Sequence, residues 1–308
     1  MSEKRLRGRV VVVTGGGRGL GREYALLAAS EGAQVVVNDL GGGPHGEPGS
    51  EDPALEVASA IAAQGGAAVA DHHDITDWEG ARALIQTALD AFGELDVLIN
   101  NAGILRDRML VNMAQEEWDD VIRVHLRGHF CTTRHAAAYW RERHKKGIHK
   151  DAVVINTTSI SGLQGNVGQV NYATAKSGLA TFTLLCHMEL NKNYGVRTYA
   201  IAPGARTRLT LASPGSAPIV SEPVPENAFD FWDPANVAPC VIWLTTESCS
   251  APSGTVLGVE GDTIHLYEPW RIAKTIRAGK RWSMADLDRQ MPELLALAMT
   301  SADQAGKS

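Results

Sequence analysis

Short apolar runs recur along most of the chain, and longer segments separate them. Seven such runs cover residues 10–13, 34–38, 67–70, 95–99, 152–155, 196–201 and 255–259. Each run is short and almost free of polar positions, which is typical of a strand buried on both faces of a sheet. The pattern therefore predicts seven buried strands.

The segments between these runs place apolar residues at helical spacing. They cover residues 24–30, 54–64, 78–92, 117–144, 172–190 and 234–246. Strand and helix alternate along the chain, and parallel strands need crossover helices of this kind. The sequence predicts an α/β fold with a doubly wound parallel sheet and helices on both faces.

Three stretches fall outside this alternation. Residues 41–53 are expected to form a surface loop, and residues 207–233 a long loop able to close over a substrate. We expect a single domain over residues 1–262, followed by a C-terminal extension over residues 263–308. In the extension, a capping signal at Ser283 predicts a helix to about Met299, and the end of the chain is expected to be disordered.

A glycine-rich turn, TGGGRGLG, follows the first predicted strand at residues 14–21. Gly15 permits a tight turn, and Gly19 and Gly21 let backbone approach a pyrophosphate. The N-terminus of the following helix supplies N–H groups for phosphates. Strand, glycine-rich turn and helix in this order predict a dinucleotide-binding site.

The second predicted strand ends at Asp39, 18 residues after Gly21. A carboxylate at this place bonds the ribose hydroxyls of the cofactor and repels a 2′-phosphate, which favours NAD over NADP. Arg18 argues the other way, because a guanidinium group in the turn is able to pair with a 2′-phosphate. We give Asp39 more weight, because it stands at the strand end where the 2′ position must lie.

A serine, a tyrosine and a lysine supply the candidate reaction chemistry. Tyr172 and Lys176 are four apart on a predicted helix, so they share one face. A nearby ammonium group favours the phenolate and lowers the pKa of a tyrosine. Ser159 follows the fifth predicted strand, at the sheet edge where open α/β sheets bind ligands. This spacing alone is also common on solvated helix faces.

Other polar residues have weaker signals. Asn101 follows the fourth predicted strand, where it either hydrogen-bonds neighbouring backbone or simply forms a turn. His125 and His129 are four apart on a predicted helix, but no acidic or thiol partner stands near them, so no metal site is expected. The four cysteines form no C-x-x-C pair, and Cys131 and Cys186 are expected to be inert core residues.

The composition is that of an ordinary soluble protein, with 44% hydrophobic and 21% charged residues and a net charge of −6. No basic run points to nucleic acid, and no apolar stretch approaches the ~18 residues of a membrane span. The N-terminus lacks the apolar core of a signal peptide, and the C-terminus is not a peroxisomal signal. A cytoplasmic protein is the expectation.

Taken together and in this order, the motifs TGGGRGLG, NNAG and YATAK, with Asp39 and Ser159, resemble the short-chain dehydrogenase/reductase family. The resemblance covers residues 8–262. It implies a Rossmann-type domain, a nicotinamide cofactor, a small-molecule substrate and a homotetramer or homodimer. Tyr172 then looks like the catalytic acid/base, Lys176 like the group that lowers its pKa and binds ribose, and Ser159 like the residue that positions the substrate oxygen.

The same resemblance assigns the cofactor-binding residues. Thr207 looks like a contact of the nicotinamide carboxamide, although the spacing after Pro203-Gly204 is shorter than the commonest form. Asp74 and Ile75 match the pair that contacts adenine. The remaining positions lie in the glycine motif and at the ends of two strands: Gly15, Arg18, Gly19, Leu20, Gly21, Asp39, Leu40 and Asn101, with Tyr172 and Lys176 contributing to both sets.

One departure from the family stands in the segment Val124–Gly128, VHLRG. His125 occupies the place of a common asparagine that helps a proton relay, so it either serves the relay or simply packs. This segment is similar to the (3R)-hydroxyacyl-CoA dehydrogenase module of peroxisomal multifunctional enzyme type 2 and to bacterial hydroxysteroid or steroid side-chain dehydrogenases.

The expected activity is NAD-dependent interconversion of a secondary alcohol and a ketone. A 3-hydroxyacyl-CoA is the favoured substrate, with a steroid-derived acyl group as one option. The alternatives are a free hydroxysteroid, an NADP-dependent reduction of a 3-oxoacyl carrier protein, and a regulator that binds NAD without turnover. Four arginines flank the predicted cleft as partners for CoA phosphates or as ordinary surface residues: Arg106, Arg108, Arg206 and Arg208.

Overall fold

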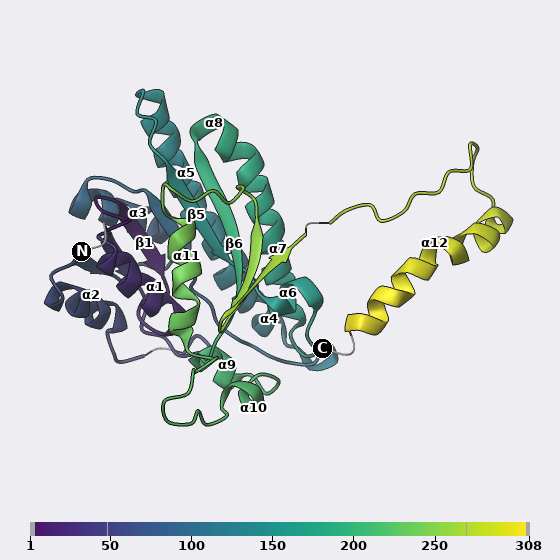
Figure 1. Cartoon of the computed structure of the whole chain (residues 1–308), viewed down its shortest axis with the longest axis horizontal. Coiled ribbons are helices and arrows are strands. Elements are labelled where there is room, and N and C mark those ends of the chain that lie inside the picture. The colour runs from purple at the N-terminus through teal and green to yellow at the C-terminus, as the bar shows by residue number, and fades with distance from the viewer. Residues whose placement is uncertain (1–3, 48, 269, 306–308) are drawn as a thin grey trace. The chain divides into compact units, whose positions relative to one another are not determined.

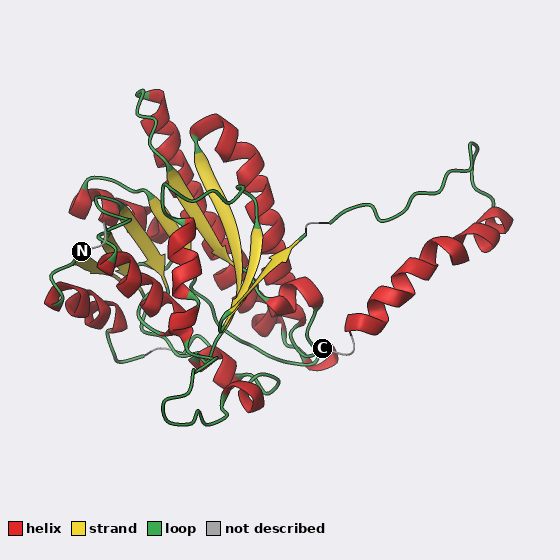
Figure 2. Ribbon diagram, viewed as in Figure 1, coloured by secondary structure: helices red, strands yellow, loops and turns green. Residues whose placement is uncertain are grey.

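A sheet of eight strands forms the centre of the fold in this computed structural model (Figure 2). The structure describes residues 4–47, 49–268 and 270–305, with side chains as far as residue 296. The strand order is β3-β2-β1-β4-β5-β6-β7-β8, and all neighbours are parallel except β7 and β8. The strands are β1 (Val10–Thr14), β2 (Gln34–Asn38), β3 (Ala67–Asp71), β4 (Val97–Asn100), β5 (Ala152–Thr157), β6 (Val196–Gly204), β7 (Val256–Glu260) and β8 (Thr263–Tyr267). The predicted doubly wound α/β fold is confirmed.

Helices cover both faces of the sheet (Figure 1). On one face lie α1 (Gly19–Ser30), α2 (Pro53–Ala63) and α11 (Ala238–Leu244); on the other lie α3 (Trp78–Phe92), α5 (Gly128–Lys145) and α7 (Val170–Cys186). Shorter helical segments connect them: η1 (Leu110–Asn112), α4 (Gln115–Ile122), η2 (Arg123–Arg127), α6 (Ile160–Gln164), η3 (His187–Asn191), α8 (Lys192–Tyr194), α9 (Arg208–Ala212), α10 (Ala217–Val220) and η4 (Pro234–Asn236).

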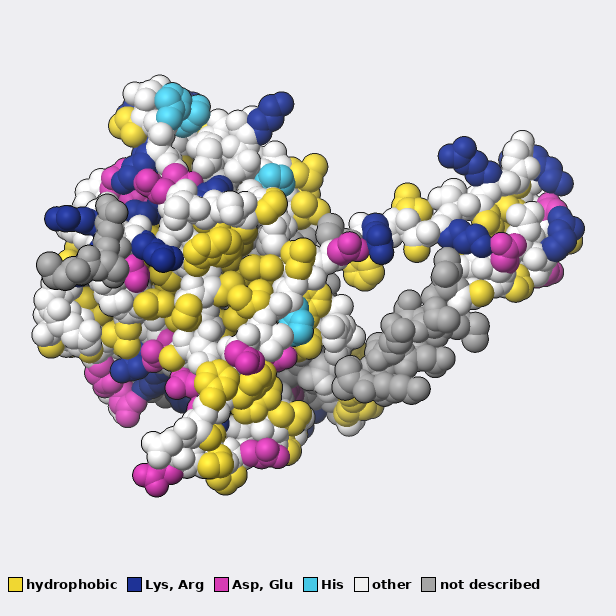
Figure 3. All heavy atoms as spheres, viewed as in Figure 1, with side chains coloured by type: hydrophobic (Ala, Val, Ile, Leu, Met, Phe, Trp, Pro, Cys, Tyr) yellow, Lys and Arg dark blue, Asp and Glu magenta, His cyan; other side chains and the backbone are white. Residues whose placement is uncertain are grey.

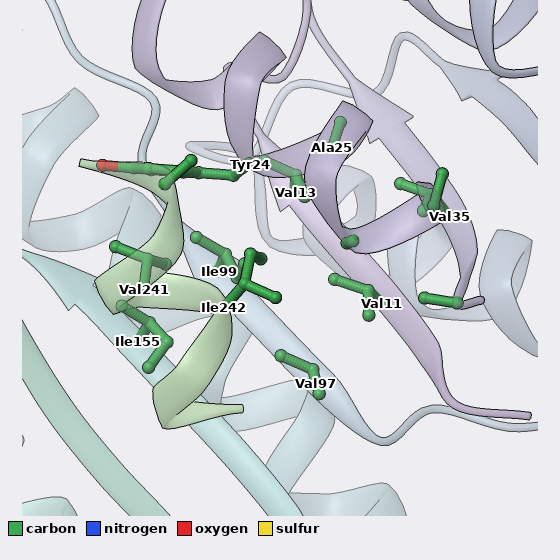
Figure 4. Close-up of a cluster of buried hydrophobic side chains, with 14 of the residues drawn as sticks. Val11, Val13, Tyr24, Ala25, Val35, Val97, Ile99, Ile155, Val241 and Ile242 are labelled. Carbon is green, nitrogen blue, oxygen red and sulfur yellow. The ribbon is translucent and has the colours of Figure 1, made fainter. Parts of the chain in front are cut away.

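The core between the sheet and the first of these layers is made of the predicted apolar runs. Val11 and Val13 of β1 meet Tyr24 of α1 and Val241 and Ile242 of α11 (Figure 4). All five side chains are at most a few per cent exposed. Because a strand between two helical layers is buried on both faces, four of the five positions of β1 are valine, which explains its apolar run.

Several predicted segments differ from the structure, among them the helix expected over residues 172–190, which ends in the π-helical segment η3. The helix expected over residues 117–144 is divided into α4, the π-helical turn η2 and α5. The loop expected over residues 207–233 contains the short helices α9 and α10. A π turn has no side-chain signature of its own, and helices of this length are too short to show a period.

The strand β8 was not predicted. It pairs antiparallel with β7, and only Gly261 and Asp262 separate the two strands. The first compact unit accordingly runs from Met1 to Tyr267, past the expected boundary at residue 262. A signal was present, because residues 263–267 alternate polar and apolar side chains after a two-residue Gly-Asp turn.

The second unit, Glu268–Ser308, contains the helix α12 (Met284–Ala305). Ser283 caps it as predicted, since its Oγ accepts a hydrogen bond of 3.1 Å from the Asp286 N–H. The helix continues beyond the expected end near Met299. The sequence also predicts that the end of the chain is disordered. Residues 306–308 of that end lie outside the described residues.

The surface of the first unit carries an apolar groove between α11 and the strands β7 and β8. Figure 3 shows hydrophobic side chains gathered on this face. Trp243, Leu257, Ile264 and Leu266 are among its lining residues. No helix within the described ranges combines the length and the hydropathy needed to cross a membrane. Cys131 and Cys186 are buried, as expected.

Candidate active site

A cleft of about 480 Å³ opens at the carboxyl ends of β1 and β4, where the strand order reverses. Open α/β sheets bind ligands at such a switch point. The cleft brings together all the predicted site residues except Gly21 and Ser159. It is lined by Gly15, Arg18, Gly19, Leu20, Asp39, Leu40, Asp74, Ile75, Asn101, His125, Tyr172, Lys176 and Thr207.

The glycine-rich turn has the geometry of a phosphate cradle. A Cβ atom on Gly21 would stand 2.1 Å from the carbonyl oxygen of Gly15, so only glycine lets α1 approach the turn this closely. Arg18 precedes α1 without a side-chain capping hydrogen bond, which leaves the first N–H groups of the helix available. Free N–H groups at a helix N-terminus suit a pyrophosphate, so the residues present fit a dinucleotide.

The Asp39 carboxylate follows β2 and lines this cleft. It accepts hydrogen bonds from the N–H groups of Gly17 (3.0 Å) and Gly41 (2.8 Å), which fix both of its oxygens. Arg18 does not point freely into the cleft, because it forms an ion pair with Glu51. Sequence reasoning missed Glu51, which lies 33 residues away along the chain and in none of the motifs.

Three further residues of the cleft, Asp74, Ile75 and Asn101, follow the ends of β3 and β4. Asp74 accepts a hydrogen bond of 2.8 Å from the Thr76 N–H, and Ile75 is buried beside it. Asn101 donates from Nδ2 to the carbonyl oxygens of Thr14 (3.1 Å) and Gly15 (3.0 Å). Asn101 therefore joins β4 to the glycine-rich turn, which is the first of the two interpretations that its position in the sequence left open.

Ser159, Tyr172 and Lys176 lie together at the end of β5. The Ser159 side chain lies close enough to the Tyr172 hydroxyl to lower its pKa. Lys176 Nζ lies 5.5 Å from the centroid of the Tyr172 ring and donates a hydrogen bond of 2.6 Å to the Thr157 carbonyl. The lysine side chain is only 2% exposed. The three groups are thus close enough to act on one substrate oxygen.

The electrostatics of this cluster differ from the expectation. Burial raises the pKa of Tyr172 to about 12, and the neighbouring Ser159 side chain opposes this effect only in part. Burial also lowers the pKa of Lys176 to about 7, so this lysine is a weaker source of positive charge than an exposed one. In the chain alone, the desolvation of a phenolate therefore dominates the pKa of Tyr172.

His125 lies in the π-helical turn η2, with its ring edge-on to Tyr172 at a centroid distance of 5.1 Å. Its Nε2 lies 2.8 Å from the carbonyl oxygen and 3.1 Å from the N–H of Ile104. Burial, with the charge of Lys176 adding to it, holds the pKa of His125 well below its usual range. The ring is therefore neutral, and its Nδ1 is buried without a hydrogen-bond partner among the described residues.

Thr207 lies across the cleft from the glycine-rich turn. It caps α9 by accepting a hydrogen bond of 3.2 Å from the Thr210 N–H. A Cβ atom on Gly19 would stand 3.4 Å from the Thr207 methyl group, which places the two residues in contact distance. In the described ranges, no three His, Cys, Asp or Glu side chains gather as metal ligands would.

The four arginines named as candidate CoA partners differ in their pairing. Arg106 pairs with Asp120, Arg108 with Glu117 and Arg206 with Asp230. Arg208 lines the cleft and contacts the carbonyl oxygen of Gly42 at 3.3 Å. Arg208 is thus the one of these four that forms no ion pair within the described residues.

Comparisons with known proteins agree with this geometry. A family model described as short chain dehydrogenase matches residues 9–212. The crystal structure of a short chain dehydrogenase from Mycobacterium avium superposes with a TM-score of 0.83 and 47% identity, covering 95% of this chain and 96% of that one.

The chain is also similar to two curated proteins that are named as enzymes. The hydroxyacyl-CoA dehydrogenase ChsB1 of Mycobacterium tuberculosis is 40% identical over 294 residues, which are 94% of this chain and 90% of the relative. The peroxisomal multifunctional enzyme type 2 of Mus musculus is 42% identical over 253 residues, 82% of this chain but only 32% of that larger protein. With its family model, its fold and its relatives in agreement, the chain belongs to the short-chain dehydrogenase family.

Proposed function

We propose that this protein is an NAD-dependent dehydrogenase that interconverts a 3-hydroxyacyl-CoA and the corresponding ketone. Family membership makes it an oxidoreductase that acts on CH–OH groups with a nicotinamide cofactor. The observation that carries the proposal is the joint position of Ser159, Tyr172 and Lys176, the last two of which line the same cleft as the glycine-rich turn. The relative named as a hydroxyacyl-CoA dehydrogenase, which this chain matches over 90% of its length, supports the substrate class.

Each residue of the cluster has a distinct task. Tyr172 exchanges the proton of the substrate hydroxyl through its Oη, and Ser159 donates a hydrogen bond to the oxygen on which charge develops. When bound, the nicotinamide cofactor supplies the hydride acceptor or donor. Because the pKa of Tyr172 is about 12 in the chain alone, Tyr172 is a proton donor at neutral pH, and alcohol oxidation needs a charge that favours its phenolate.

His125 is proposed as a member of the proton path beside Tyr172. Its ring is neutral and buried, and its Nδ1 has no partner among the described residues. A neutral imidazole donates at one nitrogen and accepts at the other, so it is able to pass a proton. The alternative, simple packing, predicts that His125→Asn and His125→Leu lose activity equally. A proton path predicts that only the asparagine variant retains activity.

NAD is proposed as the cofactor, held by the turn from Gly15 to Gly21, by Asp39 and Leu40, by Asp74 and Ile75, and by Thr207. The Asp39 carboxylate and the pairing of Arg18 with Glu51 both disfavour a 2′-phosphate. We also propose a cytoplasmic homodimer or homotetramer. The groove between α11 and β8 supports self-association, because contact with a second copy would bury its exposed side chains Trp243, Ile264 and Leu266.

A substrate panel tests the proposed activity. Initial rates with NAD⁺ and NADP⁺ are compared for 3-hydroxyacyl-CoA esters, including a steroid-derived one, and for free hydroxysteroids. We expect turnover of the CoA esters with NAD⁺. Turnover of free hydroxysteroids alone would contradict the substrate class and leave the reaction type standing.

Tyr172→Phe tests the proton donor. We expect a loss of at least about 100-fold in kcat, because a positioned acid/base contributes at least that much. Tyr24→Phe is the matched control, since it also removes a buried hydroxyl, one without a hydrogen-bond partner in the described residues. Activity of the Tyr172 variant within a few-fold of wild type would exclude the proposed role.

A further inference from the structure

A carboxylate outside the sequence motifs stands beside Arg18, which lines the cleft. Glu51 lies between β2 and α2 and forms an ion pair with Arg18, the guanidinium group of the glycine-rich turn. We propose that Glu51 is a second determinant of cofactor choice, which excludes a 2′-phosphate by occupying Arg18 beside Asp39. This inference rests on the proposed NAD preference.

The backbone holds Glu51 in this place. A Cβ atom on Gly41 would stand 2.5 Å from the Glu51 carbonyl oxygen, so the two chain segments touch. The Gly41 N–H in turn donates a hydrogen bond of 2.8 Å to Asp39. The next residue, Asp52, caps α2 by accepting a hydrogen bond of 3.0 Å from the Leu55 N–H. Glu51 is therefore fixed between the end of β2 and the start of α2.

The charges around Arg18 disfavour the binding of a 2′-phosphate. Arg18, Asp39, Glu47 and Glu51 all lie within electrostatic range of the Arg208 guanidinium group. Three carboxylates and two guanidinium groups give this cluster a net charge of −1. A 2′-phosphate brings about two further negative charges near neutral pH, whereas ribose hydroxyls bring none and are able to donate hydrogen bonds to carboxylates.

The ion pair between Glu51 and Arg18 is exposed, so substitution of Glu51 should leave the fold intact. The side chain of Glu51 is 68% exposed and that of Arg18 is 24% exposed. Ion pairs this close to solvent contribute little to stability. An arginine released from Glu51 is free to bind a phosphate with two parallel N–H bonds. Replacement of Glu51 should therefore change cofactor affinity rather than folding.

Fluorescence titration of NADH and NADPH binding to the Glu51→Gln variant tests this inference without a substrate. We expect the Kd for NADPH to fall about tenfold, the size of one charge interaction near a protein surface. The Kd for NADH should change by less than about twofold. Glu56→Gln removes the same charge from the exposed side of α2 and should leave both Kd values unchanged.

The double variant Arg18→Ala/Glu51→Gln shows whether the effect passes through Arg18, since the gain in NADPH affinity should disappear. A wild-type preference for NADH together with an unchanged NADPH Kd in Glu51→Gln would overturn the inference and leave the proposed function intact. A gain retained in the double variant would equally overturn the role of Arg18. Equal wild-type affinity for the two cofactors would instead overturn the proposed NAD preference, and the inference with it.

Discussion

Lys176 is a buried amine that the fold holds in an unfavourable place. Its side chain is 2% exposed, its one hydrogen bond in the described structure goes to the Thr157 carbonyl, and burial lowers its pKa to about 7. Methionine has a similar length and no charge to desolvate. We predict that Lys176→Met is inactive but makes the cofactor-free protein more stable than wild type at neutral pH.

The size of the effect follows from the pKa difference. A lysine in the unfolded chain has a pKa of about 10.4, and each unit of difference corresponds to about 1.4 kcal/mol. With a folded pKa of about 7, Lys176 reduces the free energy of unfolding by about 4 kcal/mol near pH 7. Loss of the Lys176 hydrogen bond destabilises the variant by about 1 kcal/mol. The free energy of unfolding of Lys176→Met should therefore exceed that of wild type by about 3 kcal/mol. For a domain of this size, that difference raises Tm by roughly 6–12 °C.

The pH dependence gives the decisive assay. Between about pH 7 and about pH 10, the unfolded chain binds a proton at Lys176 that the folded chain has released. The wild-type protein therefore becomes more stable as the pH rises through this window. Because the variant lacks this titrating group, the Tm difference between Lys176→Met and wild type should become smaller. Thermal melts followed by circular dichroism measure it, with the exposed Lys192→Met as a control. A variant no more stable than wild type at pH 7, or a difference independent of pH, would refute the reasoning.

Two further substitutions test close contacts. In Gly103→Ala the new Cβ atom would stand 2.3 Å from His125 Cε1. We expect the displaced imidazole ring to reduce kcat/KM at least about tenfold, measured with saturating cofactor. Unchanged kinetics would contradict this packing. Arg143→Met leaves the fully buried Asp96 carboxylate short of one partner, so urea unfolding should show a loss of about 3 kcal/mol. Glu94→Gln should lose less than about 1 kcal/mol, because Glu94 is 31% exposed, and equal losses for the two would count against this account.

The features that the sequence predicted depend on local chemistry. The strands β1 to β7 could be located because their central positions are mostly apolar, as in strands covered on both faces. The glycine-rich turn lies directly after β1, so its context is local as well. Tyr172 and Lys176 lie one turn apart on a single helix, and the structure brings Ser159 to them because it directly follows β5.

The features that the sequence did not predict depend on distant residues or on burial. Glu51 meets Arg18 only through the path of the chain between β2 and α2. The raised pKa of Tyr172 is set by burial in the surrounding packing, which the sequence does not display. The strand β8 is the exception, because its alternating pattern and its Gly-Asp turn are both local signals.

The π-helical turn η2 also fixes the length of its segment. A π turn holds one residue more than an α-helical turn, and each residue rotates a helix by about 100°. Deleting one residue from 123–127 would restore a regular helix but would rotate α5 relative to α4. Either His125 would then leave Tyr172, or Trp140 would lose its place in the core and its hydrogen bond of 2.8 Å to the Leu95 carbonyl. The segment thus sets the rotation of α5 relative to α4. It should tolerate replacement of a side chain, such as His125→Asn, but neither insertion nor deletion of a residue.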